Sequence, residues 1–135
     1  MTNSFLIQIG RITVNFQFLE YSIRYAIKIL SEKNQEFNQE DFFNSKTSFG
    51  HLISRLKQLS VQCEHPNELK ELISEVTQIK DKRNDIIHSI WWANGDNIER
   101  EKENKFTEVK INDLKKMAKE IIAVQYKINS FLENY

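Results

Sequence analysis

The chain has 135 residues, 40% of them hydrophobic and 28% charged, which suits one domain with a substantial core and excludes an intrinsically disordered protein. Lysine plus arginine and aspartate plus glutamate number 19 each, so a general electrostatic attraction to nucleic acid is excluded. Three glycines and one proline are too few for the turns of an all-β fold. We therefore expect a single, mostly helical domain over residues 1–135.

The sequence also bears on compartment and cofactors. No apolar run approaches the ~18 residues of a membrane-spanning helix, and the N-terminus lacks the basic and then apolar pattern of a signal peptide. The single cysteine, Cys63, excludes an intramolecular disulfide, and with His65 as its one neighbouring ligand it does not make a zinc site. Three glycines cannot build a phosphate loop or a dinucleotide fingerprint. We expect a cytoplasmic protein that has no metal, no cofactor and no membrane contact.

The first helix is predicted from Ser4 to Leu30, because apolar residues recur there every three or four positions. This main stripe consists of Phe5, Ile9, Ile12, Phe16, Leu19, Ile23, Ala26 and Leu30. A second apolar stripe lies on another side of the same helix and consists of Ile7, Val14, Phe18, Tyr21 and Tyr25. A helix that is apolar on two faces is covered on two faces. The second cover is either another subunit or the edge of the same core, with Tyr21 and Tyr25 flanking it.

The middle of the chain predicts a connection and a second helix. Residues 31–47 are polar and read as a connection, with room for a helical turn at Glu40 to Phe43. Thr47 or Ser48 is the expected N-cap of a second helix. The apolar positions of this helix are Phe49, Leu52, Ile53, Leu56 and Leu59.

Two further helices complete the predicted fold. Pro66 suits the first turn of a third helix that runs to about His88 or Ile90. Residues 91–110 include an Asn-Gly turn pair and predict an irregular loop or small hairpin. Asn112 is the expected cap of the last helix, whose stripe is Leu114, Met117, Ile121, Val124, Ile128 and Phe131. The pattern predicts an all-α, four-to-five-helix up-down bundle with a short loop or hairpin between the last two helices.

The apolar stripe of the third helix is interrupted once, by Arg83 between Ile79 and Ile86. A charge in an apolar stripe requires a partner or a function. The planar guanidinium suits a phosphate oxygen, and His88, five residues later, transfers protons near neutral pH. Together the two groups could cleave RNA without a metal, one stabilising charge on the phosphoryl group and the other acting at the ribose 2′-hydroxyl or the leaving oxygen.

Helix geometry complicates this pairing. A five-residue step rotates about 500° and rises about 7.5 Å, so the side chains of Arg83 and His88 diverge by about 140°. Asn84 and His88 share a face, and Asp81 lies close to it. Either the helix ends or bends near His88, or a second copy completes the site across a two-fold axis. The structural alternative pairs Arg83 with a carboxylate such as Glu20 and uses His88 to cap the final carbonyls.

The segment Arg83-Asn84-Asp85-Ile86-Ile87-His88 resembles the Arg-Asn-x3-His motif of the HEPN superfamily, and its place late in the third helix of a small bundle resembles that family as well. The resemblance implies a HEPN-like domain with metal-independent endoribonuclease activity. It also implies a homodimer in which the two motifs face each other in a cleft. Proteins of this kind are often toxins or antiviral defence effectors in bacteria.

The resemblance assigns a role to each motif residue. Arg83 would stabilise the scissile phosphate, His88 would be the acid–base group, and Asn84 would orient it. Arg100 and Lys102, which follow the helix, are candidate RNA-backbone contacts on charge and sequence proximity alone, and a solvated loop is the alternative.

The resemblance also bears on partners. Toxins controlled by a nucleotidyltransferase antitoxin carry a tyrosine two residues after the histidine, and Ile90 stands there in this chain, which puts that route of regulation in doubt. The expected partners are RNA at a local site, a second copy, and an antitoxin or defence partner. The alternative function is a non-catalytic HEPN-like dimerisation or binding module in a defence or regulatory system.

Overall fold

The computed structural model describes residues 3–33, 47–93 and 111–134. These residues form four α-helices and no strand: α1 (Asn3–Lys33), α3 (Phe49–Ser60), α4 (Pro66–Ala93) and α6 (Ile111–Glu133). The prediction of an all-helical fold is confirmed for this part of the chain. None of its helices is sufficiently long and apolar to span a membrane. The predicted turn at Glu40 to Phe43 and all but the first three residues of the loop or hairpin predicted over 91–110 lie outside the described residues.

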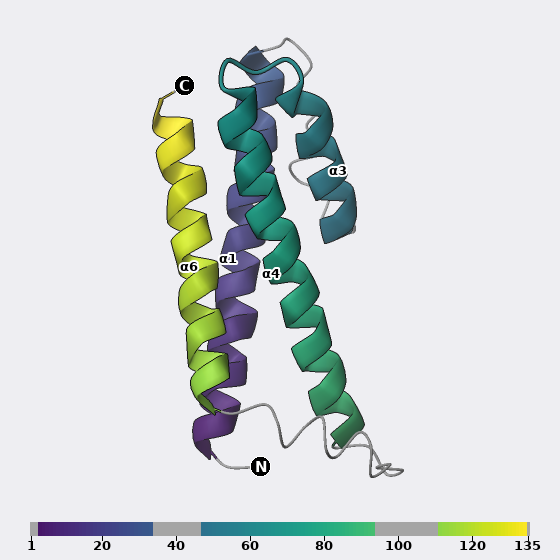
Figure 1. Ribbon diagram of the computed structural model, residues 1–135, viewed down its shortest axis with the longest axis vertical. Helices are drawn as coiled ribbons and strands as arrows, with labels where there is room; N and C mark the ends of the chain where they lie inside the picture. Colours follow the sequence, from purple (N-terminus) through teal and green to yellow (C-terminus); the bar gives the residue numbers. More distant parts are fainter. Residues whose placement is uncertain (1–2, 34–46, 94–110, 135) are drawn as a thin grey trace.

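The helices lie side by side along one long axis (Figure 1). α1, α3 and α6 run in the same direction and α4 runs in the opposite one. α1 packs against α3 and α6, and α4 packs against the same two helices from the other side. α3 is short and covers only the half of the bundle in which α1 ends and α4 begins.

The core is built from the stripes that the sequence predicts. On α1, Ile9 is the one member of the main stripe that is half-buried, and the other seven are buried. All six predicted positions of α6 are buried as well, from Leu114 to Phe131. Spacings of three and four place these side chains on one face of each helix, and that face turns toward the other helices. One hydrophobic cluster therefore joins all four described helices.

Two predicted helix starts are confirmed. The Ser48 hydroxyl accepts a hydrogen bond of 3.1 Å from the backbone N–H of His51, so Ser48 rather than Thr47 is the N-cap of α3. Pro66 is the first residue of α4, where its missing N–H breaks no helical hydrogen bond.

Three predicted boundaries are wrong. α1 continues to Lys33, and Ser31, expected in a connection, is fully buried within the helix. α4 continues to Ala93, because the first strong turn pair after His88 is Asn94-Gly95, so residues 91–93 are helical. α6 begins at Ile111, which places Asn112 inside its first turn rather than at its cap.

We predict that Ile121→Ala lowers the free energy of unfolding by about 2–5 kcal/mol, because Ile121 is fully buried and the change leaves a cavity. Its neighbour Ile122 is 37% exposed, and Ile122→Ala is the matched control, expected to cost less than about 1 kcal/mol. Urea unfolding followed by circular dichroism measures both values. Equal losses in the two variants would contradict the core described above.

Candidate functional site

The helix that carries the Arg-Asn-x3-His motif continues through and beyond it. α4 runs to Ala93, so it does not end at His88. A helix end near His88 therefore cannot bring Arg83 and His88 together within one copy. His88 precedes the last four residues of α4, whose carbonyls are the ones without a partner inside the helix. The motif is therefore displayed along regular helix, and its side chains point where helical geometry sends them.

Arg83 stacks on an aromatic ring. Its guanidinium carbon lies 4.7 Å from the ring centroid of Phe16 in α1. The Phe16 ring in turn lies 4.6 Å from the ring of Phe49, the first residue of α3, with an interplanar angle of 34°. A guanidinium over the face of an aromatic ring is attracted by the ring's quadrupole. The cation in the apolar stripe thus has an aromatic partner, and it joins three helices at one level.

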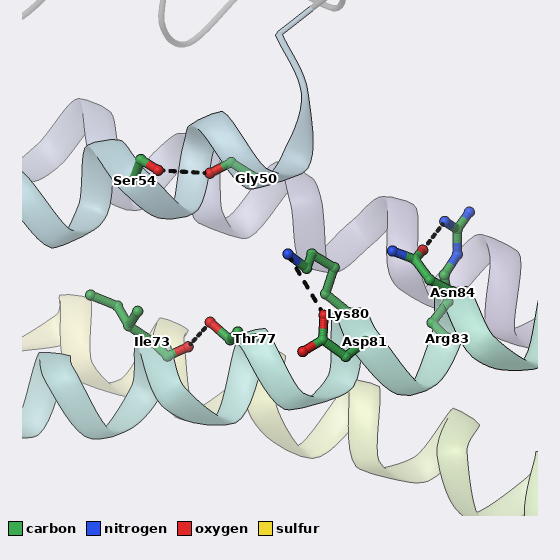
Figure 2. A network of polar contacts seen from close by, with 8 residues as sticks. All are labelled: Gly50, Ser54, Ile73, Thr77, Lys80, Asp81, Arg83 and Asn84. Atoms are coloured by element: carbon green, nitrogen blue, oxygen red, sulfur yellow. Dashed lines mark hydrogen bonds and ion pairs between the residues drawn. The ribbon is translucent and has the colours of Figure 1, made fainter.

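The polar contacts of Arg83 are few. Its Nη1 donates a hydrogen bond of 3.1 Å to Oδ1 of Asn84, the next residue (Figure 2). Its Nε is buried without a hydrogen-bond partner. The proposed pairing with Glu20 is wrong, because the Glu20 carboxylate lies 3.7 Å from Arg24 on its own helix. Arg24 is itself buried, and it also donates to the Thr47 carbonyl at 3.1 Å.

Asn84 and His88 lie on an outer face of α4. Both are exposed and are four residues apart, so they share one side of the helix. α3 begins at the level of Phe16 and Arg83, and the part of α4 that carries His88 extends past that end of α3 (Figure 1). Within one copy, Arg83 and Asn84 are in contact, while Arg83 turns inward and His88 turns outward.

Charges of both signs lie near the motif. The carboxylate of Asp81, which the sequence places near the Asn84–His88 face, lies 3.7 Å from Nζ of Lys80 (Figure 2). On another side of α4, a groove of about 290 Å³ lies between α4 and α6. It is lined by two lysines and three carboxylates, together with two apolar residues: Lys82, Lys116, Asp85, Asp113, Glu120, Ile86 and Met117. Since its net charge is slightly negative, this groove does not attract an RNA backbone.

The groove was not anticipated from the sequence, because its two walls lie some 30 residues apart along the chain. One ion pair spans it, between Lys82 and Glu120 at 3.5 Å. Among the described residues, no group of three His, Cys, Asp or Glu side chains is arranged to hold a metal ion. Arg100 and Lys102, the candidate RNA-backbone contacts, lie outside the described residues.

The comparisons with known proteins leave the family resemblance as a sequence observation. No family model, curated protein or solved structure significantly matches this chain. The features of this chain that bear on its function are therefore the motif itself and the geometry of α4.

We predict a coupling of about 0.5–1 kcal/mol between Arg83 and Phe16 in a double-mutant cycle of unfolding free energies. Arg83→Met keeps the apolar stem, and Phe16→Leu keeps an apolar side chain without the ring, so the cycle isolates the stacking of cation on ring. Lys57, a cation near the other end of α3, provides the control Lys57→Met, which should add to Phe16→Leu without coupling. Additivity within about 0.3 kcal/mol for Arg83 as well would contradict the stacking.

Proposed function

We propose that this chain is a HEPN-type, metal-independent endoribonuclease of the toxin or antiviral-defence kind, with a composite Arg/His site at a homodimer interface. The observation that carries the proposal is the Arg83-Asn84-x3-His88 motif on uninterrupted helix, with Asn84 in contact with Arg83 and His88 exposed. An exposed imidazole can exchange protons with a substrate, as general acid–base catalysis requires.

Each motif residue has a distinct task in the proposed reaction. His88 takes the proton of the ribose 2′-hydroxyl or gives one to the leaving oxygen. Arg83, half-exposed, stabilises the charge that develops on the phosphoryl oxygens. The Asn84 carbonyl fixes the direction of the guanidinium through its 3.1 Å hydrogen bond, in addition to the role of orienting His88 that the family resemblance implies.

A second copy is part of the proposal because of the direction of the side chains. Arg83 and His88 diverge by about 140° on regular helix, so one copy does not present both to one phosphate. A two-fold axis beside this end of α4 places a second motif opposite the first, and the substrate then lies between the two. Since the whole chain has no net charge, RNA binding would be local, with Arg100 and Lys102 as proposed backbone contacts.

One observation favours a second candidate function. Arg83 is already stacked on Phe16, inside the bundle, which is the place of a residue that holds helices together. A non-catalytic HEPN-like dimerisation or binding module in a defence or regulatory system would keep this contact and need no open cleft at His88. The two candidates differ in RNA cleavage and in the effect of His88 on it.

We predict that wild-type protein cleaves RNA in EDTA and that Arg83→Ala and His88→Ala each lower the cleavage rate by about 10²–10⁴-fold. The matched controls are His51→Ala and Lys57→Ala, which change an exposed imidazole and an exposed cation away from the motif and should retain wild-type rates. Helicity and oligomeric mass, measured on all five proteins, confirm that folding is intact. Wild-type protein that leaves RNA uncut would rule out the enzyme and favour the binding module.

We also predict that expression of wild-type protein arrests growth of a bacterial host and that His88→Ala relieves the arrest. Growth curves at matched protein levels, verified by immunoblotting, provide the measurement. Equal growth of the two strains would exclude a toxin acting through His88, whether or not the purified protein cleaves RNA.

A further inference from the structure

The second apolar stripe of α1 lies on the surface of the structure. We call Ile7, Val14, Phe18, Tyr21 and Tyr25 the outer face of α1; their side chains are between 41% and 61% exposed in the described part of the chain. Isolated exposed apolar residues are ordinary, whereas five in one row on one helix, three of them aromatic, mark an interaction surface. The position of this row and the spacing of its members identify what binds there.

The outer face lies on the far side of α1 from the catalytic motif. Phe16, on which Arg83 stacks, is about 160° around the helix from the middle of this face. Two copies joined through the outer face would therefore carry their motifs on opposite outer sides of the pair. This surface is distinct from the composite-site interface, and the inference below does not rest on the proposed function.

The spacing along the outer face is that of a coiled-coil seam. Together with position 11, its members fall at positions 7, 11, 14, 18, 21 and 25, so the steps alternate between four and three residues. That alternation is the heptad repeat by which two helices pack knobs into holes. The one polar residue in the row is Arg11, which is exposed. The natural occupant of such a row is another helix with the same repeat.

Charge selects an antiparallel copy of α1 as that helix. A parallel pair would set Arg11 against Arg11 and, farther along the helix, Lys28 against Lys28. Like charges that face each other are unfavourable. An antiparallel pair centred between residues 19 and 20 would set Arg11 against Lys28, which repel as well. Centred on residue 16, an antiparallel pair sets Arg11 over the ring of Tyr21, a favourable cation–π arrangement.

The same register also pairs the apolar positions. With the axis at residue 16, Val14 meets Phe18 and Ile7 meets Tyr25 of the other copy, so four of the five members of the outer face have an apolar or aromatic neighbour and the fifth, Tyr21, faces Arg11. An aromatic side chain buries about 150–250 Å² when fully covered, so the half-exposed rings of the two copies together offer roughly 500–700 Å². Flanking residues must supply about as much again to reach the ~1,200 Å² of a small specific interface, so we expect micromolar affinity.

We propose that the outer face of α1 binds the same face of a second copy, antiparallel and about a two-fold axis at the level of residue 16. An interface of this kind is isologous and closes as a dimer. If the composite-site dimer also forms, two different two-fold interfaces on one chain build a tetramer or a longer assembly. Self-association through α1 would then bring several nuclease sites together without contributing a residue to any of them.

The first test measures mass by sedimentation velocity from about 1 to 200 μM. Phe18→Glu, which places a charge in the centre of the seam, is expected to weaken self-association at least tenfold and to halve the mass of the assembly. The matched control is Leu6→Glu, a residue of the same helix that is 51% exposed but lies off the seam, and it should associate as wild type does. Tyr21→Lys serves as a second seam variant, with helicity verified for each.

The second test determines orientation and register by pulsed electron paramagnetic resonance. Spin labels are attached at Ser4→Cys and at Glu32→Cys, two exposed positions at the ends of α1, in a Cys63→Ser background. An axis at residue 16 places the label pairs about 36 Å and about 48 Å apart along the helix, since each residue rises 1.5 Å. An axis between residues 19 and 20 would reverse the order of the two distances, and a parallel pair would shorten both to about 10 Å.

The outcomes separate this inference from the proposed function. Wild-type protein that stays monomeric at 200 μM, or that sediments as Phe18→Glu does at every concentration, overturns the α1 interface. A parallel or shifted pair of spin-label distances overturns its register. RNA cleavage tests the proposed function alone. Sedimentation of His88→Ala as wild type, together with loss of its RNA cleavage, would support an α1 interface that is independent of the nuclease site.

Discussion

The stack of Arg83 on Phe16, with Phe49 against the same ring, is the contact that ties the motif-bearing part of α4 to α1 and α3. It joins α4, α1 and α3 at one level. A half-buried cation is costly unless its charge is compensated, and here an aromatic face supplies the compensation that a carboxylate would otherwise give. Because the ring is apolar, the stripe of α4 can continue past Arg83 to Ile86 without an ion pair inside the core.

The same contact has a consequence for chemistry. The guanidinium contacts a ring through its face and Asn84 through one hydrogen bond, and both contacts favour one direction of the side chain. Preorganised donors stabilise developing charge without reorganising during the reaction, which is the largest electrostatic advantage that an active site has. The inward direction of Arg83 is thus compatible with a catalytic role, provided that the phosphate approaches its half-exposed edge, and it equally suits a purely structural role.

Sequence periodicity was sufficient for the helices and their buried faces, because steps of three and four determine a face wherever the chain is helical. The N-cap at Ser48 and the start at Pro66 were predictable for the same local reason: each depends on a few adjacent residues. The predicted ends of α1 and α4 are too early, since residues 31–33 and 91–93 carry no helix breaker: the polar composition after Leu30 and the Asn94-Gly95 pair suggested an end before the helix stops. The second apolar stripe is a separate face of α1, as its spacing predicts, and its exposure shows that the core formed by the described residues does not cover it.

The partner of Arg83 could not have been predicted in the same way. Phe16 lies 67 residues earlier in the chain, and nothing in the local pattern distinguishes it from the other members of its stripe. Glu20 was the reasonable choice by charge, yet its own helix offers Arg24 four residues away, and such a local pair needs no tertiary alignment to form. Which of two partners a cation takes depends on the register of α4 against α1, and register is a property of the packed core as a whole. The direction of Arg83 therefore follows from the core, whereas the exposure of His88 follows from helical spacing alone, and a site made from both requires the fold and a second molecule together.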